Sequence, residues 1–218
     1  HRRLIKTKLD GTVVWEHGAP VEAEFNGAKC YANEGDWNAT NVAFSPNGDI
    51  FVGDGYGKSF VHIYSKDGAY KQTICGPGSE AGQVSSPHGL WWDDRIGTLA
   101  VADRGNNRIQ YFAETSAGQP WKHVSFVKDA MRQPCHFKTR GDTLLVPDLS
   151  SAVEILGKDN KSLAILGDGH PTNLRGAARK DFIPGKFVHP HSAMFLADGS
   201  ILVVEWVPIG RVTRLVKA

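Results

Sequence analysis

The sequence predicts an all-β protein, a β-propeller built from four-stranded blades. Two observations indicate this: a hairpin pattern that recurs along the chain, and the near absence of helical periodicity. Each copy of the pattern has a short apolar run, a turn with Gly, Asp or Asn, and a second apolar run that ends in a carboxylate. The copies are residues 41–54, 89–103, 136–148 and 192–205.

Further strand-like runs follow each hairpin. Third runs lie at residues 60–64, 108–112, 152–156 and 211–216, and fourth runs at 70–74, 122–127 and 162–166. The closing acids are spaced 49, 45 and 57 residues apart, at Asp54, Asp103, Asp148 and Glu205. Four short strands with a period of roughly 40–50 residues are typical of a propeller blade. A βαβ fold is excluded because the sequence leaves no room for helices between the strands.

We expect one domain over residues 1–218. It would contain an incomplete blade at 1–18 and blades at about 41–76, 89–127, 135–169 and 190–218. Because propellers protect their sheet edges by closure, we expect that about a blade and a half of the ring is missing at the N-terminus. The alternative is a five-bladed ring closed by an abnormal blade.

Composition narrows the function classes. The 218 residues are 41% hydrophobic and carry a net charge of +2, with no block of Lys or Arg. We therefore expect neither nucleic-acid binding nor attachment to a membrane surface, and no apolar run approaches the ~20 residues of a membrane helix. Cys30, Cys75 and Cys135 are too few for a disulfide framework, which leaves open one Cys30–Cys75 bridge or three thiols.

Candidate site residues cluster at one point of the repeat. In a blade the innermost strand is antiparallel to the second, so the start of one and the end of the other share a face of the disc. His88 lies 15 residues before Asp103, and His191 occupies the equivalent place 14 residues before its own closing acid. Tyr56 follows the first closing acid by two positions, and Arg104 follows Asp103 directly. We expect His88, His191, Tyr56 and Arg104 at one mouth of the central channel.

Two histidines at one repeat position suggest a metal site. Neutral imidazole suits Zn²⁺, and a catalytic zinc typically keeps three protein ligands and one open position. His136, near the same repeat position in the third blade, would be the third ligand, and His189 is the other candidate. The alternative is that Pro-His at the start of a strand is turn chemistry, with the imidazole bonded to the backbone.

Tyr56 and Arg104 complete the predicted site. Tyr56 lies in the flexible segment GDGYG, where a phenol beside a metal ion and an arginine could act as a base. Arg104 opens the segment RGNNR, and its guanidinium could hold a carboxylate through two hydrogen bonds. The alternatives are an ordinary rim aromatic and an ion pair with Asp103. The closing acids Asp54, Asp103 and Asp148 are predicted to cap the backbone of their loops.

These residues resemble a known family. Residues 87–90 (PHGL) and 102–110 (ADRGNNRIQ) look like an NHL repeat. Together with residues 54–56 (DGY) and 190–191 (PH), they resemble the peptidyl-α-hydroxyglycine α-amidating lyase family. The resemblance covers about residues 41–218. It implies a six-bladed propeller with a catalytic zinc at the channel mouth, and a monomer in an extracellular or periplasmic location.

The resemblance also implies residue roles. His88 and His191 match zinc ligands, Tyr56 matches the catalytic base, and Arg104 matches an arginine that binds the substrate carboxylate. The implied reaction splits a peptidyl-α-hydroxyglycine, a small-molecule or peptide substrate, into an amide and glyoxylate. A calcium ion is implied beside the last Pro-His pair, where Ser192 stands in place of the family's acid. The alternative is a non-catalytic NHL propeller that binds a ligand or another protein.

Overall fold

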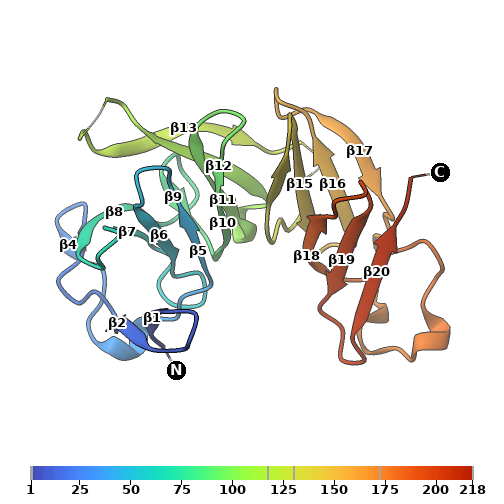
Figure 1. Ribbon diagram of the computed structural model, residues 1–218, viewed down its shortest axis with the longest axis horizontal. Helices are drawn as coiled ribbons and strands as arrows, with labels where there is room; N and C mark the ends of the chain where they lie inside the picture. The colour runs from blue at the N-terminus through green and yellow to red at the C-terminus, as the bar shows by residue number, and fades with distance from the viewer. Residues whose placement is uncertain (1, 117, 130, 172, 218) are drawn as a thin grey trace. The chain divides into compact units, whose positions relative to one another are not determined.

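The computed structural model describes residues 2–116, 118–129, 131–171 and 173–217, and Figure 1 shows their strands. The chain divides into two compact units. The first comprises His1–Trp92, Leu99–Asn106 and Gln110–Ser125, and the second comprises Asp93–Thr98, Asn107–Ile109 and Phe126–Ala218. Within the described residues, helix is limited to short 3₁₀ turns: η1 (Glu34–Asp36), η2 (Arg104–Asn106), η3 (Leu174–Gly176) and η4 (Arg179–Asp181). The all-β prediction is confirmed.

The first unit contains an N-terminal hairpin, a short two-stranded ladder and two blade-like sheets. The hairpin and the ladder are formed by β1 (Leu4–Thr7) with β2 (Val13–His17), and by β3 (Glu24–Phe25) with β4 (Ala28–Lys29). The first blade-like sheet runs in the order β5 (Asn41–Phe44), β6 (Ile50–Gly53), β7 (Val61–Tyr64), β8 (Tyr70–Pro77) and β9 (Gln83–Val84). The second runs in the order β10 (Pro87–Asp93), β11 (Thr98–Asp103), β12 (Arg108–Glu114) and β13 (Trp121–Val127). The ends of some of these last strands fall in the second unit.

The second unit holds the remaining two sheets. One is formed by β14 (Lys138–Arg140), β15 (Thr143–Asp148), β16 (Ala152–Leu156) and β17 (Ser162–Leu166), and the other by β18 (Pro190–Phe195), β19 (Ile201–Glu205) and β20 (Arg211–Leu215). All their strand pairs are antiparallel between neighbours in sequence. The strand β18 packs beside β15, so consecutive blades face one another in this unit (Figure 1). The predicted strands of residues 41–218 are thus all present, with shifts of a few residues at their ends.

Aromatic and aliphatic side chains fill the space between consecutive sheets. In the first unit Phe51 packs against Trp121 and Trp92, with ring centres 4.9 and 6.4 Å apart. In the second unit, Leu145 and Val203 are fully buried in the corresponding core. Each such side chain contributes about 1.5–3 kcal/mol through its burial.

Asp54, Asp103 and Asp148 have the structural role that the sequence predicts, and Glu205 has the same role. Each carboxylate accepts a backbone N–H from the loop that leads into its own blade, at 2.6 to 2.9 Å: Asp54 from Asn38, Asp103 from Ser85, Asp148 from Gln133 and Glu205 from Val188. Such charge-assisted bonds are stronger than bonds between neutral groups. They fix the start of each inner strand next to the end of the second strand, which positions the candidate site.

All three cysteines are buried thiols outside any disulfide, which resolves the alternative left open by the sequence. Cys30 Sγ lies 3.7 Å from Thr73 Oγ1, so its nearest polar neighbour is a hydroxyl. Burial is the main cause that raises the pKa of both Cys30 and Cys75 above its usual value. These two thiols are therefore protonated at neutral pH.

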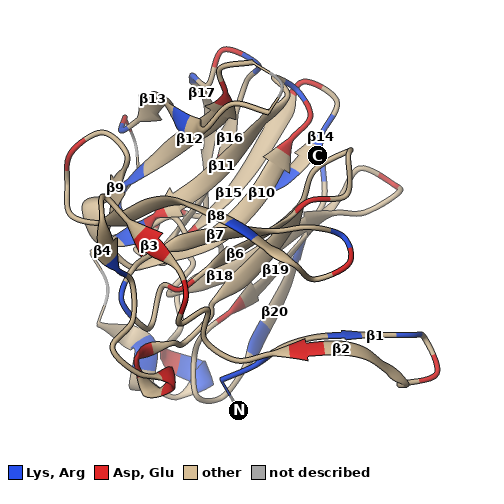
Figure 2. Cartoon of the chain, turned by 90° about the vertical axis from the view of Figure 1, so that its left-hand side faces the viewer, with Lys and Arg blue, Asp and Glu red and all other residues tan. Residues whose placement is uncertain are grey.

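The described residues include no helix with the length and hydropathy that crossing a bilayer requires. Figure 2 shows basic side chains on β1 of the N-terminal hairpin and acidic ones at its turn and on β2. Arg3 and Glu16 pair across it at 2.6 Å. The hairpin therefore presents a mixed surface rather than a basic one.

Candidate functional site

Tyr56 and His88 meet in the first unit. Tyr56 lies in the turn after β6, and His88 is the second residue of β10. Tyr56 Oη lies 3.0 Å from His88 Nε2, and the two rings are 5.5 Å apart at 76°. The imidazole is 7% exposed, whereas the phenol-bearing residue is 55% exposed. The structure thus joins two predicted site residues and leaves the phenol accessible from solvent.

Glycines allow this close approach. A Cβ atom on Gly55 would overlap the carbonyl oxygen of Pro87, and one on Gly57 would overlap the Asp54 carboxylate. Thr40 Oγ1 donates to the same Pro87 carbonyl at 2.8 Å. The backbone of the tyrosine turn therefore lies directly against the start of β10, which is why Tyr56 reaches His88.

Arg104 lies beside the same phenol. Its Cζ atom is 5.4 Å from the centre of the Tyr56 ring, within the range of a cation–π contact. Its Nη2 donates to Ser86 Oγ at 3.3 Å, and Ser86 Oγ donates to the Gly55 carbonyl at 3.0 Å. Arg104 is thus held by the loops of two blades.

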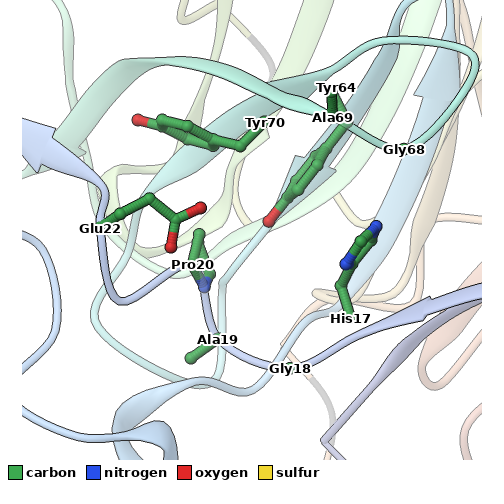
Figure 3. Close-up of a pocket in the computed structure, with 9 residues that line it drawn as sticks. All are labelled: His17, Gly18, Ala19, Pro20, Glu22, Tyr64, Gly68, Ala69 and Tyr70. Atoms are coloured by element: carbon green, nitrogen blue, oxygen red, sulfur yellow. The ribbon is translucent and has the colours of Figure 1, made fainter.

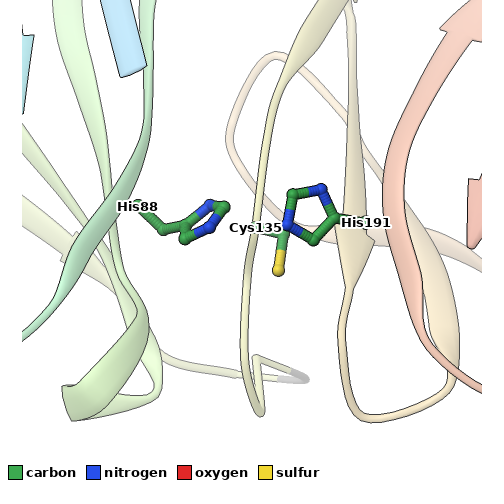
Figure 4. Close-up of side chains that lie close together, drawn as sticks. All are labelled: His88, Cys135 and His191. Carbon is green, nitrogen blue, oxygen red and sulfur yellow. The ribbon is translucent and has the colours of Figure 1, made fainter. Parts of the chain in front are cut away.

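Two potential metal ligands lie close together in the second unit. Figure 4 shows the thiol of Cys135 beside the imidazole of His191, and the Sγ atom and a ring nitrogen lie within 4.8 Å of each other. Cys135 is fully buried, and His191 is partly buried. Two such ligands of one tetrahedral zinc ion lie about 3.6 Å apart, from Zn–N of ~2.0 and Zn–S of ~2.3 Å. The donor types and their spacing therefore fit a zinc ion.

Strand register identifies Cys135 and His191 as the same repeat position. Pro134 forms a bridge with Asp148, and Pro190 pairs with Glu205, so each proline lies opposite a closing acid. The residue after each proline is the candidate ligand. Cys135 was missed by the sequence analysis because only histidines were compared between repeats. The Pro-X dipeptide at 87–88, 134–135 and 190–191 was the signal that could have found it.

The other two predicted histidines have different surroundings. His136 follows Cys135 and is partly buried. Burial, and then the positive charges of Lys138 and His191, lower its pKa to about 4, so it is neutral at pH 7. His189 Nδ1 donates to the Leu149 carbonyl at 2.7 Å. His189 therefore has the backbone-bonded arrangement that we considered for Pro-His segments in general.

Comparison with known proteins gives weak similarity to one group. No protein-family model matches the chain. It is 36% identical over 94 residues to the peptidyl-glycine alpha-amidating monooxygenase of Mus musculus, covering 40% of this chain and 10% of that protein. It is 25% identical over 191 residues to peptidyl-alpha-hydroxyglycine alpha-amidating lyase 1 of Drosophila melanogaster, covering 78% and 33%. A Xenopus laevis peptidyl-glycine alpha-amidating monooxygenase is 31% identical over 176 residues, covering 75% and 17%. The chain spans a third or less of the length of each of these relatives.

Solved structures share the fold at low sequence identity. The hydrazine synthase of Kuenenia stuttgartiensis aligns with 81% of this chain and 45% of its own, at a TM-score of 0.57 and 11% identity. A structure described as a gluconolactonase aligns with 88% of this chain and 61% of its own, at a TM-score of 0.56 and 14% identity. These likenesses support the propeller-like fold, and the sequence similarity supports a distant relation to amidating enzymes.

Proposed function

We propose that the protein is a metal-dependent lyase, on a propeller of the six-bladed type, that cleaves peptidyl-α-hydroxyglycine substrates. The observation that carries this proposal is the contact between Tyr56, His88 and Arg104 in the first unit. A phenol and a guanidinium from two turns and an imidazole from the start of β10 form one group, as acid–base chemistry on a carboxylate-bearing substrate requires. The similarity to a fly protein named for this reaction supports the substrate class.

Cys135 and His191 of the second unit are two of the proposed metal ligands, and the repeat position in the sequence assigns His88 as the third. All three follow a proline in the segment that leads into an inner strand, and zinc binds both imidazole nitrogen and thiolate sulfur. We prefer Cys135 to His136 as a metal ligand, because the strand register assigns Cys135 to the repeat position of His191. A zinc ion held there would supply Lewis acidity toward a hydroxyl group.

Tyr56 would take the proton from the α-hydroxyl of the substrate. The electron pair of that O–H bond becomes the second bond of the glyoxylate carbonyl while the C–N bond breaks. The departing amide nitrogen receives a proton, so the products are a peptide amide and glyoxylate, and the atoms balance. Arg104 would bind the substrate carboxylate through two parallel hydrogen bonds. The exposure of Tyr56 leaves the phenol open to the substrate.

Glyoxylate release tests this proposal. The zinc-loaded chain is incubated with a short N-acylated peptidyl-α-hydroxyglycine, and amide and glyoxylate are quantified together. We expect equimolar products, a kcat lowered about 100-fold or more in Tyr56→Phe, and a raised KM in Arg104→Gln. Arg214→Gln, which alters an exposed ion pair with Asp198, is the matched control. A chain with stoichiometric zinc and no glyoxylate above the buffer rate would instead support the non-catalytic binding propeller.

A further inference from the structure

The first unit contains a pocket of about 210 Å³ between the hairpin strand β2, the segment after it and the turn that joins β7 to β8 (Figure 3). His17, Glu22, Tyr64 and Tyr70 provide its polar groups, and Pro20 is among its apolar ones. None of these residues belongs to the Tyr56 cluster.

Two polar atoms at this pocket lack partners within the described structure. Tyr64 is only 2% exposed, and neither its Oη nor the Nε2 atom of His17 has a hydrogen-bond partner among the described residues. In Figure 3 the Tyr64 hydroxyl points into the pocket toward His17 and Pro20. A buried polar group without a partner costs about 1–3 kcal/mol. An external ligand would remove this cost.

Neighbouring polar groups on the same strand are satisfied. His62, two residues before Tyr64 on β7, bonds Tyr31 Oη at 2.7 Å through Nε2 and Thr73 Oγ1 at 2.9 Å through Nδ1. Tyr70 Oη also bonds Thr73 Oγ1, at 2.8 Å. The Tyr64 hydroxyl therefore differs from the neighbouring hydroxyls of Tyr31 and Tyr70, which both have partners.

The pocket favours a cation. Glu22 supplies a carboxylate, and its negative charge acts with burial, the larger cause, to raise the pKa of Tyr64 above its usual value. Tyr64 is thus a neutral hydroxyl at physiological pH. The rings of Tyr64 and Tyr70 lie 5.9 Å apart at 76°, and His17 stacks on Tyr64 at 6.0 Å. Aromatic faces and a carboxylate attract positive charge, whereas an anion would be repelled by Glu22.

We propose that this pocket binds a primary alkylammonium group. An ammonium group offers three N–H donors. The Glu22 carboxylate, Tyr64 Oη and His17 Nε2 are the polar atoms of the pocket that can accept from such donors. A quaternary ammonium group has no donor and would leave Tyr64 and His17 unpaired. The alkyl chain would lie against Pro20 and the tyrosine rings. A small amine and a lysine side chain of a peptide share this chemistry.

Calorimetry at pH 7.5 tests the proposal by measuring the affinity of n-butylammonium for the 218-residue chain. We expect binding at least about tenfold tighter than that of n-butanol or n-butyltrimethylammonium. Tyr64→Phe and Glu22→Gln should each weaken binding about tenfold or more, since each removes a bond to a charged group. Glu24→Gln removes a nearby carboxylate that does not line the pocket and should change affinity by less than about twofold.

Thermal unfolding separates lost binding from misfolding. Tyr64→Phe should unfold at the same temperature as the unaltered chain or higher, because it removes an unpaired buried hydroxyl. Tighter binding of Nα-acetyl-lysine methylamide than of n-butylammonium would identify a lysine side chain as the source, and weaker binding a small amine. Equal binding of n-butylammonium and n-butanol, or unchanged affinity in a folded Tyr64→Phe variant, would overturn the proposal and leave a pocket that holds only water.

Discussion

The closing carboxylates and the residues after the prolines lie at neighbouring ends of paired segments, yet they differ in kind. The closing positions hold Asp or Glu in every copy, and each accepts a backbone N–H from its own blade. The positions after the prolines hold His88, Cys135 and His191. One position of the repeat therefore stabilises the fold, while its neighbour is available for chemistry. Substitutions at the two positions should have separable effects.

The largest expected effect is on stability, at a closing carboxylate. Asp148 accepts the backbone N–H groups of Arg132, Gln133 and Ser150 at 2.7, 2.9 and 2.8 Å. Asp148→Ala leaves all three without their acceptor and should lower the free energy of unfolding by about 3–5 kcal/mol. Urea unfolding measures the change. Asp142→Ala, at an exposed side chain, should stay within about 0.5 kcal/mol. A loss below about 1 kcal/mol at Asp148 would contradict the structural role.

A second effect on stability comes from acid pH at His62. Burial lowers its pKa to about 3 from the model-peptide value of 6.5. Between these values the unfolded chain binds a proton that the folded chain does not, so the free energy of unfolding falls as pH falls. The expected loss is roughly 3 kcal/mol from pH 6.5 to pH 4, at about 1.4 kcal/mol per pH unit. His62→Gln should flatten this slope in chemical denaturation, and an unchanged slope would exclude His62 as its source.

Substitution after a proline should affect metal affinity more than stability. His191→Ala should weaken zinc binding at least about 100-fold, while the metal-free protein loses less than about 1.5 kcal/mol, because His191 is only partly buried. Competition with a chromogenic chelator measures the affinity. His170→Ala, at an exposed histidine, is the matched control. Equal zinc affinity in both variants would remove His191 from the ligand set.

The smallest effect on stability is expected at Tyr56. Its side chain is mainly exposed and its hydroxyl bonds His88 Nε2. Tyr56→Phe should change the free energy of unfolding by less than about 0.5 kcal/mol. Because the phenol occupies a ring nitrogen that a metal ion could use, zinc affinity should stay equal or rise in this variant. A lower zinc affinity would show that the phenol is itself a metal ligand.

The sequence predicted most of the fold because its information is local. Apolar runs, turns and closing acids recur with the repeat, and these set the strands and the capping bonds. The sequence also predicted that Tyr56, His88 and Arg104 lie close together, since the topology of a blade places strand starts beside strand ends.

The site was harder to predict from the sequence, because the type of side chain at one repeat position differs between the blades. Cys135 was assigned to a scattered set of cysteines, whereas its place after Pro134 makes it the counterpart of His191. The alkylammonium pocket has no local signal at all. It depends on His17 of the hairpin and Tyr64 of β7, which are 47 residues apart and meet only through tertiary packing.

Cobalt substitution tests the central claim, the proposed metal site, most directly. The metal-free chain is titrated with Co²⁺ and the absorption spectrum is compared between the unaltered protein, Cys135→Ala and His88→Ala. The ligand set that the repeat position assigns predicts one equivalent of Co²⁺ with tetrahedral d–d bands and a thiolate-to-cobalt charge-transfer band. That band should vanish in Cys135→Ala, and affinity should fall in His88→Ala. Saturable binding without a thiolate band, or a spectrum unchanged in both variants, would contradict the proposed ligand set.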